Sequence, residues 1–565
     1  MKKFNLDKYI YLLGFTNTYQ FLGKFILPVI VVSFVLFFIL NLFVPVHFFL
    51  HYIVFAISLS FVFIYPMMIH EKKRLDIEEN LHLFITYAGT ISTMKIGRAM
   101  LFKRMSQKKV FGEISEISNK IYYLAKKWNM GFAKTCRKIG KLSPSKLFSD
   151  FLDRMALVMD LGKDLDIFLL EEQDSLMEDF ATNYKKSLEN IRLIQNVFVS
   201  ITVSMSFLMA VALLIPLILG TPMEIIIQFA FLAIVVIDAL IFVLIKAFIP
   251  GDRIPHSYER KSTGMKKVKR IFLIILPVSL TLTVFMVYLN RFAPLVNLAI
   301  GITPLAIVGF IANREEDYIM RRDKIYPTFV RLLGSAIEVR NGAVISSLFS
   351  MRVHDFGILN EYVVDIYRRL RIGSDKIKSW VYFASDTGSN LIMNFNKIFY
   401  ESIYLGGNAE KIGEIVSNNF MKLLSLRKLR LQMSSGLKGA TYGSLVGFTA
   451  SVFISIEIAD SLSSLFKQPF TQIEGSSFAA NLGSILPQMQ SIDLGKAGFF
   501  LSLMIVIHAS CSAYVLKMVD GGFKLSCLLD LVLMIWLAAI VSVAIPNMMG
   551  EMLVGLGLNS TTPMV

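Results

Sequence analysis

The chain has 565 residues, of which 55% are hydrophobic and 18% charged, and its 58 Lys and Arg against 42 Asp and Glu give a formal net charge of +16. Soluble domains contain about 45–50% apolar and about 25% charged residues, so this composition excludes a single water-soluble globular domain. Basic residues are costly at the bilayer centre. The sequence therefore predicts a polytopic membrane protein in which apolar spans alternate with charged, water-exposed segments.

Nine apolar segments are long enough to cross a bilayer, which requires about 20 residues. The first follows a basic N-terminus, but it is too long for a signal peptide and lacks a small-residue cleavage site, so we expect it to be retained. The predicted fold class is all-α, with about nine transmembrane helices. In chain order they lie near residues 25–45, 48–69, 197–219, 224–248, 271–290, 293–312, 439–459, 497–518 and 524–546.

The distribution of Lys and Arg orients these spans, because cytoplasmic loops are enriched in basic residues. With the N-terminus in the cytoplasm, only Arg291, Lys467 and Lys496 would face outward. The opposite orientation would translocate nearly every positive charge. We therefore expect a multi-pass protein of the cell membrane with a cytoplasmic N-terminus and an extracellular C-terminus.

These boundaries divide the chain into five segments. Two of them, of nearly equal length, are long and charged, and we expect them to be cytoplasmic helical modules. In chain order the segments are residues 1–69 with the first two spans, 70–196 as the first module, 197–312 with four spans around a basic cytoplasmic loop at 249–270, 313–437 as the second module, and 438–565 with three spans, an external loop at 460–496 and an external tail.

The two modules are predicted to be copies of one unit, because residues 84–97 align with residues 329–342 without a gap. Apolar residues recur there at helical spacing, starting from Phe84 and Phe329. Further helical patterns cover 114–127, 148–161 and 165–180, so each module is predicted to be a bundle of about five or six helices. Three glycine pairs share an offset of 245 residues: Gly89 and Gly334, Gly97 and Gly342, and Gly162 and Gly407.

Two of these glycines are expected to end a helix. Gly97 and Gly342 follow the first apolar pattern of each copy. Glycine accepts the left-handed conformation that closes many helices at little cost. The sequence therefore predicts a left-handed C-terminal residue at both positions.

No nucleotide-binding or catalytic motif is found in the sequence. Gly140-Lys141 lacks the upstream glycine and the following Ser or Thr that a Walker A loop requires. The cysteines Cys136, Cys511 and Cys527 are isolated and the seven His are scattered, which argues against disulfides and a zinc site. We therefore predict a protein that is not an enzyme and uses no cofactor.

Polar residues inside the spans are functional candidates, because lipid does not compensate their burial. Asp238 lies in the middle of a predicted span, Asp530 lies near the start of the last one, and His508 lies in the eighth. A transporter would use such groups to couple an ion. The alternative is that Asp238 pairs with another helix inside the bundle and has a structural role.

The seventh predicted span begins with two overlapping GxxxG steps. They place Gly439, Gly443 and Gly447 on one helix face, where another helix can approach closely. The partner is either another span of the same chain or the same span of a second copy. In both cases we expect this face to be buried against protein.

Clusters of basic residues in the two modules are candidate docking sites. They have three interpretations: solvated helix faces, contact with anionic lipid headgroups, or docking of an acidic cytoplasmic partner. Nucleic acid is disfavoured, because acidic residues are interspersed and no aromatic stacking platform accompanies them. The clusters are Lys103, Arg104, Lys108 and Lys109 in the first module and Arg368, Arg369, Arg371, Lys376 and Lys378 in the second.

The repeat resembles the F domain of type II secretion and type IV pilus systems. Two such domains, each with an extra pair of spans in front, are similar to the archaeal platform proteins of archaellum assembly. The resemblance covers about residues 70–520. It rests on the heads Phe84, Gly89 and Gly97 and Phe329, Gly334 and Gly342, each followed by a later glycine, Gly162 or Gly407, and by a pair of spans.

The resemblance implies a non-catalytic membrane platform. A cytoplasmic hexameric ATPase would dock on the modules, and pilin-like subunits would leave the bilayer and join the filament base with other machine components. Assembly as a homodimer is compatible with this family. The alternatives are the platform of an adhesive type IV pilus or of a type II secretion-like system, an ion- or solute-coupled transporter, and a membrane anchor for signalling complexes.

Overall fold

The computed structural model describes residues 28, 48–94, 96–219, 223–289, 291–472 and 494–555. Side chains are described for a smaller set, residues 28, 69–94, 96–211, 227–289, 291–461 and 498–552. Throughout this part of the chain the regular elements are helices, and the one β-bridge joins Pro255 to Ser389. The predicted all-α class is confirmed.

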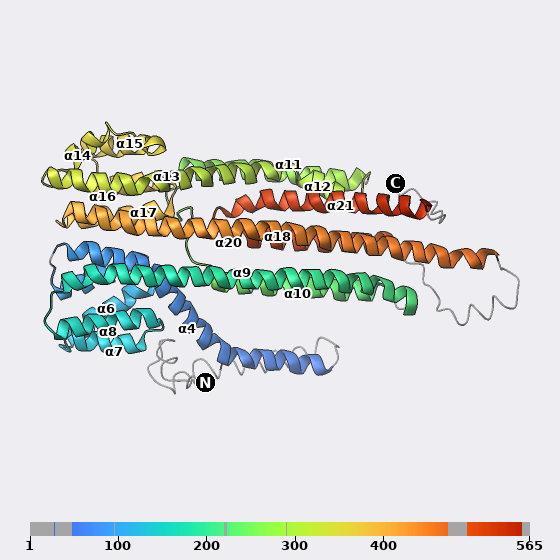
Figure 1. The fold of residues 1–565 in the computed structure, drawn as a ribbon, viewed down its shortest axis with the longest axis horizontal. Helices are drawn as coiled ribbons and strands as arrows, with labels where there is room; N and C mark the ends of the chain where they lie inside the picture. Colours follow the sequence, from blue (N-terminus) through green and yellow to red (C-terminus); the bar gives the residue numbers. More distant parts are fainter. Residues whose placement is uncertain are drawn as a thin grey trace. The chain divides into compact units, whose positions relative to one another are not determined.

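The first half of the described chain forms a long helix, four short helices and a second long helix, followed by two apolar helices (Figure 1). A 3₁₀ turn at Lys109–Phe111 precedes the second short helix. The helices are α4 Phe48–Ser92, α5 Arg98–Ser106, α6 Glu113–Lys127, α7 Phe132–Leu142, α8 Lys146–Asp160, α9 Leu165–Leu219, α10 Met223–Phe248 and α11 Thr263–Leu289.

The second half repeats the same order of elements. A 3₁₀ turn at Gly357–Leu359 again precedes the second short helix, and another at Lys524–Ser526 precedes the last helix. The helices are α12 Pro294–Ile302, α13 Leu305–Val339, α14 Val344–Met351, α15 Asn360–Arg371, α16 Lys376–Thr387, α17 Asn390–Tyr404, α18 Ala409–Gln472, α20 Leu494–Asp520 and α21 Cys527–Gly555.

The order of helices confirms the internal repeat. We call α4–α9 the first repeat and α12–α18 the second repeat. Helices α7, α8 and α9 start 244 residues before α16, α17 and α18, respectively. The predicted helical pattern at 114–127 coincides with α6 to within one residue, and the one at 148–161 coincides with α8 to within two. The pattern at 165–180 begins at the first residue of α9, which continues to Leu219.

Equivalent aromatic residues form the two cores. Phe84 is 2% exposed and meets Phe111 edge to face, with ring centroids 6.0 Å apart. Its counterpart Phe329 is fully buried and meets Phe356 in the same geometry at 5.4 Å. Such aromatic pairs add to the hydrophobic stabilisation of a core. Each repeat therefore uses the same pair of positions to pack its long first helix against its 3₁₀ turn.

The structure corrects two of the glycine predictions. Gly342 has φ of +83°, as expected after α13, but Gly97 has φ of −65° and precedes α5, while α4 already ends at Ser92. The left-handed prediction is therefore wrong for Gly97. The counterpart of Gly162 (φ +65°) is Gly406 (φ +90°) and not Gly407, because the short helices before them set the offset at 244 residues.

Among the described residues, six helices are long and apolar enough to cross a membrane, and the pair α12 and α13 makes a seventh if it counts as one span. They carry the last seven of the nine predicted spans. The predicted span at 293–312 is broken and not continuous: the chain bends by 48° between α12 and α13, where Pro304 interrupts the helix. Apart from Pro28, residues 25–45 lie outside the described residues, as do the side chains of 48–68, so the count of nine stays a prediction.

The described chain separates into two compact units that cut across the predicted segments. Unit 1 comprises residues 1–180, 337–342 and 398–419, and unit 2 comprises 181–336, 343–397 and 420–565. Polar contacts inside unit 1 tie the end of α17 and the start of α18 to α4. The hydroxyl of Ser402 donates to Thr90 Oγ1 at 2.9 Å, and Asn419 Nδ2 donates to Thr86 Oγ1 at 2.8 Å.

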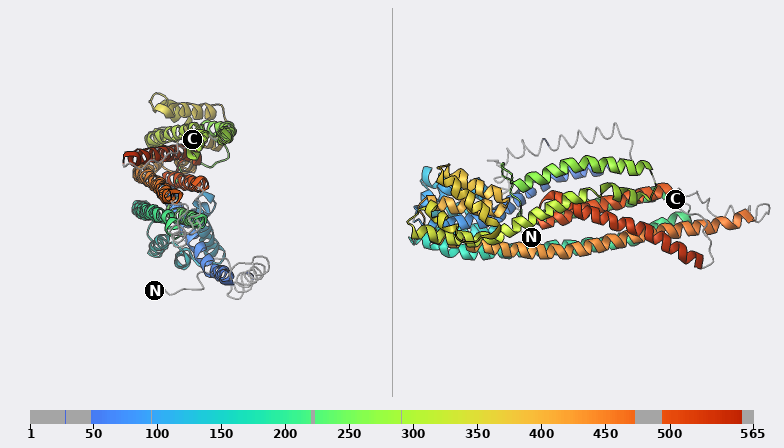
Figure 2. Two further views of the ribbon diagram at one scale, coloured as in Figure 1. Left: turned by 90° about the vertical axis from the view of Figure 1, so that its right-hand side faces the viewer. Right: turned by 90° about the horizontal axis from the view of Figure 1, so that it is seen from above.

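In unit 2 the apolar helices run along one direction (Figures 1 and 2). Helices α9 and α18 lie side by side there, and they meet within two residues of their equivalent positions. Ser451 Oγ donates to the carbonyl of Ser206 at 2.9 Å, 245 residues away, and Gln195 Nε2 donates to the carbonyl of Leu437 at 3.2 Å, 242 residues away, whereas the helices are offset by 244. Contact between nearly equivalent positions of parallel helices is typical of a two-fold relation, so we infer a pseudo-two-fold axis between α9 and α18 in unit 2.

Candidate functional site: a buried charge network

A cluster of charged side chains lies in unit 2, where its apolar segments end. All but Asp252 and Lys438 are buried, which is rare for charged residues unless they are paired. We call this cluster the charge network. Its members are the acids Asp252, Glu316, Asp323, Asp520 and Asp530 and the bases Arg427, Arg430, Lys438 and Lys517.

Arg427 of α18 joins two carboxylates from distant parts of the chain. Its Nε and Nη2 donate to the two oxygens of Asp252, both at 2.6 Å, and its Nη1 donates to Asp323 at 2.8 Å. Asp323 lies on the charged part of α13, beyond the predicted span at 293–312, and burial raises its pKa to about 6 although Arg427 acts in the opposite direction. Paired, hydrogen-bonded charges of this kind offset the cost of their burial.

Arg430, one turn further along α18, binds main-chain carbonyls. It donates to Val519 at 2.5 Å and to Met518 at 3.1 Å, at the end of α20. It also donates to the carbonyls of Pro250 and Asp252 in the loop after α10. The last carbonyls of a helix lack partners within the helix and carry partial negative charge, so a buried guanidinium stabilises the end of α20.

The turn between α20 and α21 contains two glycines that the network requires. Gly521 has φ of +77°, and a Cβ at this position would lie 2.9 Å from both Arg430 Nη2 and the carbonyl of Asp252. A Cβ at Gly522 would collide with the carboxylate of Glu316. Since larger residues would push the charged groups apart, the Gly-Gly turn allows α18 and α13 to approach the end of α20 closely.

The remaining contacts extend the network to α21. Lys517 Nζ donates to Glu316 at 2.6 Å, and the backbone N–H of Phe523 donates to the other oxygen of Glu316 at the same distance. Lys438 lies 3.3 Å from Asp520 and 3.5 Å from Asp530. Asp530, predicted as a polar residue near the start of the last span, is therefore one member of a larger cluster.

The network connects one long helix to four other segments. Helix α18 has 64 residues, about 96 Å of helix at 1.5 Å per residue. Through Arg427, Arg430 and Lys438 it is bound to α13, to the loop after α10, and to both helices of the α20–α21 turn. A displacement of α18 must therefore either move these segments with it or break buried ion pairs, which is costly.

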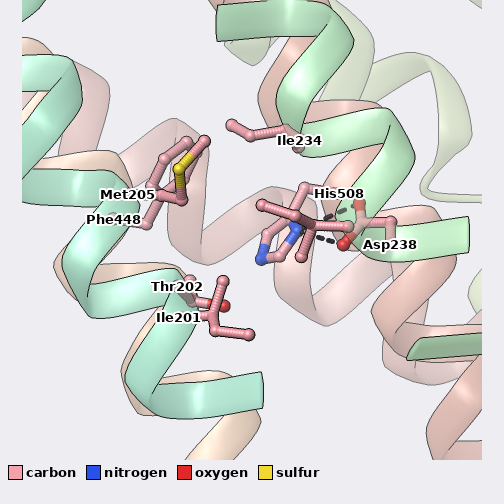
Figure 3. Close-up of a pocket in the computed structure, with 8 residues that line it drawn as sticks. Ile201, Thr202, Met205, Ile234, Asp238, Phe448 and His508 are labelled. Carbon is pink, nitrogen blue, oxygen red and sulfur yellow. Dashed lines mark hydrogen bonds and ion pairs between the residues drawn. The ribbon is translucent and has the colours of Figure 1, made fainter. Parts of the chain in front are cut away.

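The second polar feature is a pair of residues inside the spans (Figure 3). His508 Nδ1 of α20 lies 3.0 and 3.1 Å from the carboxylate oxygens of Asp238 on α10, and both side chains are buried. The adjoining pocket has a volume of about 10 Å³ and is lined by Ile201, Thr202, Met205, Ile234, Ile237 and Phe448. This volume accommodates at most a water molecule, so the pair connects two helices and the pocket has no room for a solute.

Comparison with known proteins places the chain in a family. It is 33% identical over 537 residues to Flagella accessory protein J of Methanocaldococcus jannaschii, covering 93% of this chain and 94% of that protein. It is 31% identical over 494 residues to Flagella accessory protein J of Methanococcus voltae, covering 85% and 86%. The chain belongs to the Flagella accessory protein J (FlaJ, ArlJ) family.

Membership of the FlaJ family confirms the resemblance to archaellum platform proteins and, with the apolar helices, identifies a multi-pass membrane protein of the archaeal flagellum. A shorter match, 22% identical over 136 residues, covers 24% of the chain and is to an uncharacterized protein of M. jannaschii. No family model matches the chain, and no solved structure matches it. Among the described residues, no group of three or more His, Cys, Asp and Glu is arranged to hold a metal ion.

The structure places the GxxxG face of this FlaJ-family chain differently from expectation. Gly439, Gly443 and Gly447 are exposed, and no described atom outside their own stretch of helix lies within 4 Å of a Cβ added at any of them. Helix α18 packs through its other side, where Leu445 and Phe448 are buried. The expectation that the chain itself buries this face is therefore wrong for the described residues.

The basic clusters are only partly available for docking. Lys108 forms an ion pair with Glu401 and lies over the ring of Tyr87. Arg369 pairs with Asp386 at 2.9 Å, and Arg368 pairs with Asp365 at 3.5 Å. Arg104 is half-buried. The other candidates are exposed: Lys103, Lys109, Arg371, Lys376 and Lys378.

Most of the charge network is not evident from the sequence. Arg427, Arg430 and Lys517 counted there only as basic residues on the inner side, and Glu316 and Asp323 were not singled out. One signal was present: Asp520-Gly521-Gly522 forms a tight turn between two spans, preceded by a lysine three residues earlier. It indicates a close approach at that turn but does not identify the partner, because the ion-pairing residues are far apart in the sequence.

Proposed function

We propose that the chain is a non-catalytic platform of the archaellum that couples a cytoplasmic hexameric ATPase to the extraction and assembly of pilin-like filament subunits. The observation that carries this proposal is the charge network, which binds α18 to the ends of the apolar helices. A machine that converts movement in the cytoplasm into movement of spans needs a stiff connection at this point. Buried ion pairs on a continuous helix supply one.

The proposed direction of coupling follows from the charge distribution along α9 and α18. Both helices begin in charged sequence and continue without a break into apolar sequence. An ATPase that displaces the charged ends of α9 and α18 would therefore also displace their apolar parts, because each helix is continuous. The proposal includes a cytoplasmic N-terminus and an extracellular C-terminus, as the bias of Lys and Arg predicts.

The experiment is reconstitution of the full chain in liposomes with a pilin-like subunit of the same organism, with and without its motor ATPase. We expect ATP-dependent release of the subunit from the bilayer only when all three proteins are present. Release without the chain, or binding of neither partner by folded chain, would contradict the proposal.

We also propose that the exposed GxxxG face of α18 receives a second copy of the chain. No described atom outside their own stretch of helix covers the three glycines, which permits close contact of two α18 helices, and small-residue faces drive such association in lipid. Gly443→Leu should lower the dimer fraction in nanodiscs at least fivefold. Gly550→Leu, at another uncovered glycine on α21, is the matched control and should leave it unchanged. Equal dimer fractions for all three proteins would exclude this interface.

The platform of an adhesive pilus or of a secretion-like system would use the same mechanics, and the filament subunit recovered with the chain distinguishes them. A transporter is less well supported, because the pocket beside Asp238 and His508 has a volume of about 10 Å³. That volume is far below the several hundred Å³ of an ordinary ligand site.

A further inference from the structure

Helix α7 of the first repeat carries an exposed basic stripe that neither the charge network nor the predicted docking clusters include. Its opposite side, with Cys136, Ile139 and Gly140, is buried against α8, which lies beside it in Figure 1. The stripe lines a hollow of about 430 Å³ together with Leu142. Its members, at positions i, i+3, i+4 and i+7 of one helix face, are Lys134, Arg137, Lys138 and Lys141.

This arrangement is unfavourable for an isolated helix. Lys134 and Lys138, and likewise Arg137 and Lys141, are like charges four residues apart, and such pairs destabilise a helix. Among the described residues only Arg137 forms an ion pair, with Asp160 at 2.5 Å, and both side chains are more than 40% exposed. Exposed pairs contribute little to stability. An anionic partner on this face would remove the repulsion.

The second repeat shows that the fold does not require the stripe. In its equivalent helix, α16, the counterparts of Arg137 and Lys138 are Val381 and Tyr382. There the face is covered by Arg260 of the loop after α10. The Arg260 guanidinium lies 4.1 Å from the Tyr382 ring centroid and 3.0 Å from Asp386.

The same helix face therefore has opposite chemistry in the two repeats. In the second repeat an aromatic and acidic face binds a cation of the chain itself. In the first repeat the face is basic, and among the described residues only those of α7 line its hollow. Charge complementarity requires an acidic occupant here.

The stripe belongs to the charged part of the chain that is predicted to be cytoplasmic, residues 70–196. Asp160, which Arg137 contacts, lies just before the start of α9 at Leu165. Charged residues continue along α9 to Arg192, about 40 Å of helix at 1.5 Å per residue. An acidic protein on the cytoplasmic side is therefore the occupant that the charge of the stripe favours.

We propose that the α7 stripe is the docking site for an acidic segment of a cytoplasmic protein. In the platform model this protein is the motor ATPase, and to that extent the inference rests on the proposed function. The stripe lies on the first repeat only, so a partner docks asymmetrically on a chain whose spans are related by a pseudo-two-fold axis.

The test uses the full chain in nanodiscs and two probes, a fluorescent oligoglutamate peptide and the motor ATPase of the same organism. The stripe variant combines Lys134→Ser, Lys138→Ser and Lys141→Ser. The control variant combines Lys185→Ser, Lys186→Ser and Lys428→Ser, three exposed lysines on α9 and α18. We expect the stripe variant to bind both probes at least tenfold more weakly, with a smaller salt dependence, and the control variant to bind as the unchanged protein does.

The outcomes separate the docking site from the proposed function. If the unchanged protein binds the ATPase and the stripe variant binds it equally well, the stripe is not the docking site, and the platform proposal stands. If the peptide binds through the stripe but the ATPase does not bind at all, the acidic docking site stands and the ATPase coupling fails. Equal peptide binding by stripe and control variants would overturn the inference, as would a preference of the stripe for RNA over both probes.

Discussion

The two repeats share their core but differ at the long last helix. Phe84 and Phe329 pack in the same way against the same 3₁₀ turn. At the positions of Arg427 and Arg430 on α18, however, α9 has Asn183 and Lys186, both exposed. The arginines at the centre of the charge network therefore occur in one repeat only. A duplicated fold has kept its packing, while one copy has acquired the connection to the spans and the other a free basic face.

The largest expected effect in this comparison comes from Arg427→Gln. It leaves Asp252 and the fully buried Asp323 without their cation, and breaking a buried pair costs about 3–5 kcal/mol. The measurement is the denaturation midpoint of the full chain in detergent. Asn183→Gln, at the equivalent exposed position of α9, should change the unfolding free energy by less than about 0.5 kcal/mol. Similar losses of unfolding free energy in both variants would mean that Arg427 contributes no more to stability than the equivalent exposed residue of the first repeat.

A smaller effect is expected at the glycines with positive φ. Gly521→Ala combines left-handed strain, about 1–2 kcal/mol, with a Cβ placed 2.9 Å from the Arg430 guanidinium. Gly162→Ala has the strain alone, because nothing lies within 4 Å of its added Cβ. Thermal unfolding should rank Gly521→Ala as the more destabilised of the two. The reverse order would exclude a tight turn at the network.

The smallest effect concerns pH and the loop after α10. His256 Nδ1 accepts from the Tyr258 N–H at 3.1 Å, so its Nε2 carries the proton and donates to the carbonyl of Ser385 at 3.0 Å. Burial lowers the pKa of His256, although the Ser385 carbonyl acts against this. The pKa of His256 in the folded protein lies below its value of about 6.5 in the unfolded chain. The stability that neutral His256 contributes is therefore complete above about pH 6.5 and is lost as the pH falls through the folded pKa.

The amide of His256 donates to the carbonyl of Gly388, and the amide of Asn390 donates to the carbonyl of Ile254. We call these two hydrogen bonds the loop clamp. Hydrogen exchange at the two amides measures how far the loop clamp loses stability at low pH. Their protection should fall between pH 7 and pH 5. His256→Gln should make it insensitive to pH over this range, whereas His354→Gln, at an exposed histidine, should preserve the pH dependence. If the protection of these amides in the unchanged protein stays constant between pH 7 and pH 5, protonation of His256 does not affect the stability of the loop clamp.

Hydropathy and spacing were sufficient to predict the fold class, the repeat and the positions of α4, α6, α8 and α9 in the first repeat, whereas α5 and α7 were not singled out. The described helices that are long and apolar enough to cross a membrane coincide with the last seven predicted spans. Phe84 and Phe329 are buried, as their helical spacing indicates. These properties are local, because a helix needs one apolar face or a long apolar run and both can be read within about 20 residues.

Only the tertiary structure decided how the polar residues pair. Arg427 and Asp252 are 175 residues apart, and Asp238 and His508 are 270 apart, so no local pattern links them. The same holds for the glycines: the lengths of the short helices before them made Gly406 and not Gly407 the counterpart of Gly162. The GxxxG face is exposed because α18 uses its opposite side for packing. Sequence alone determined which segments are helical and apolar, and the tertiary fold determined which of their charges meet, because ion pairing depends on distance in space.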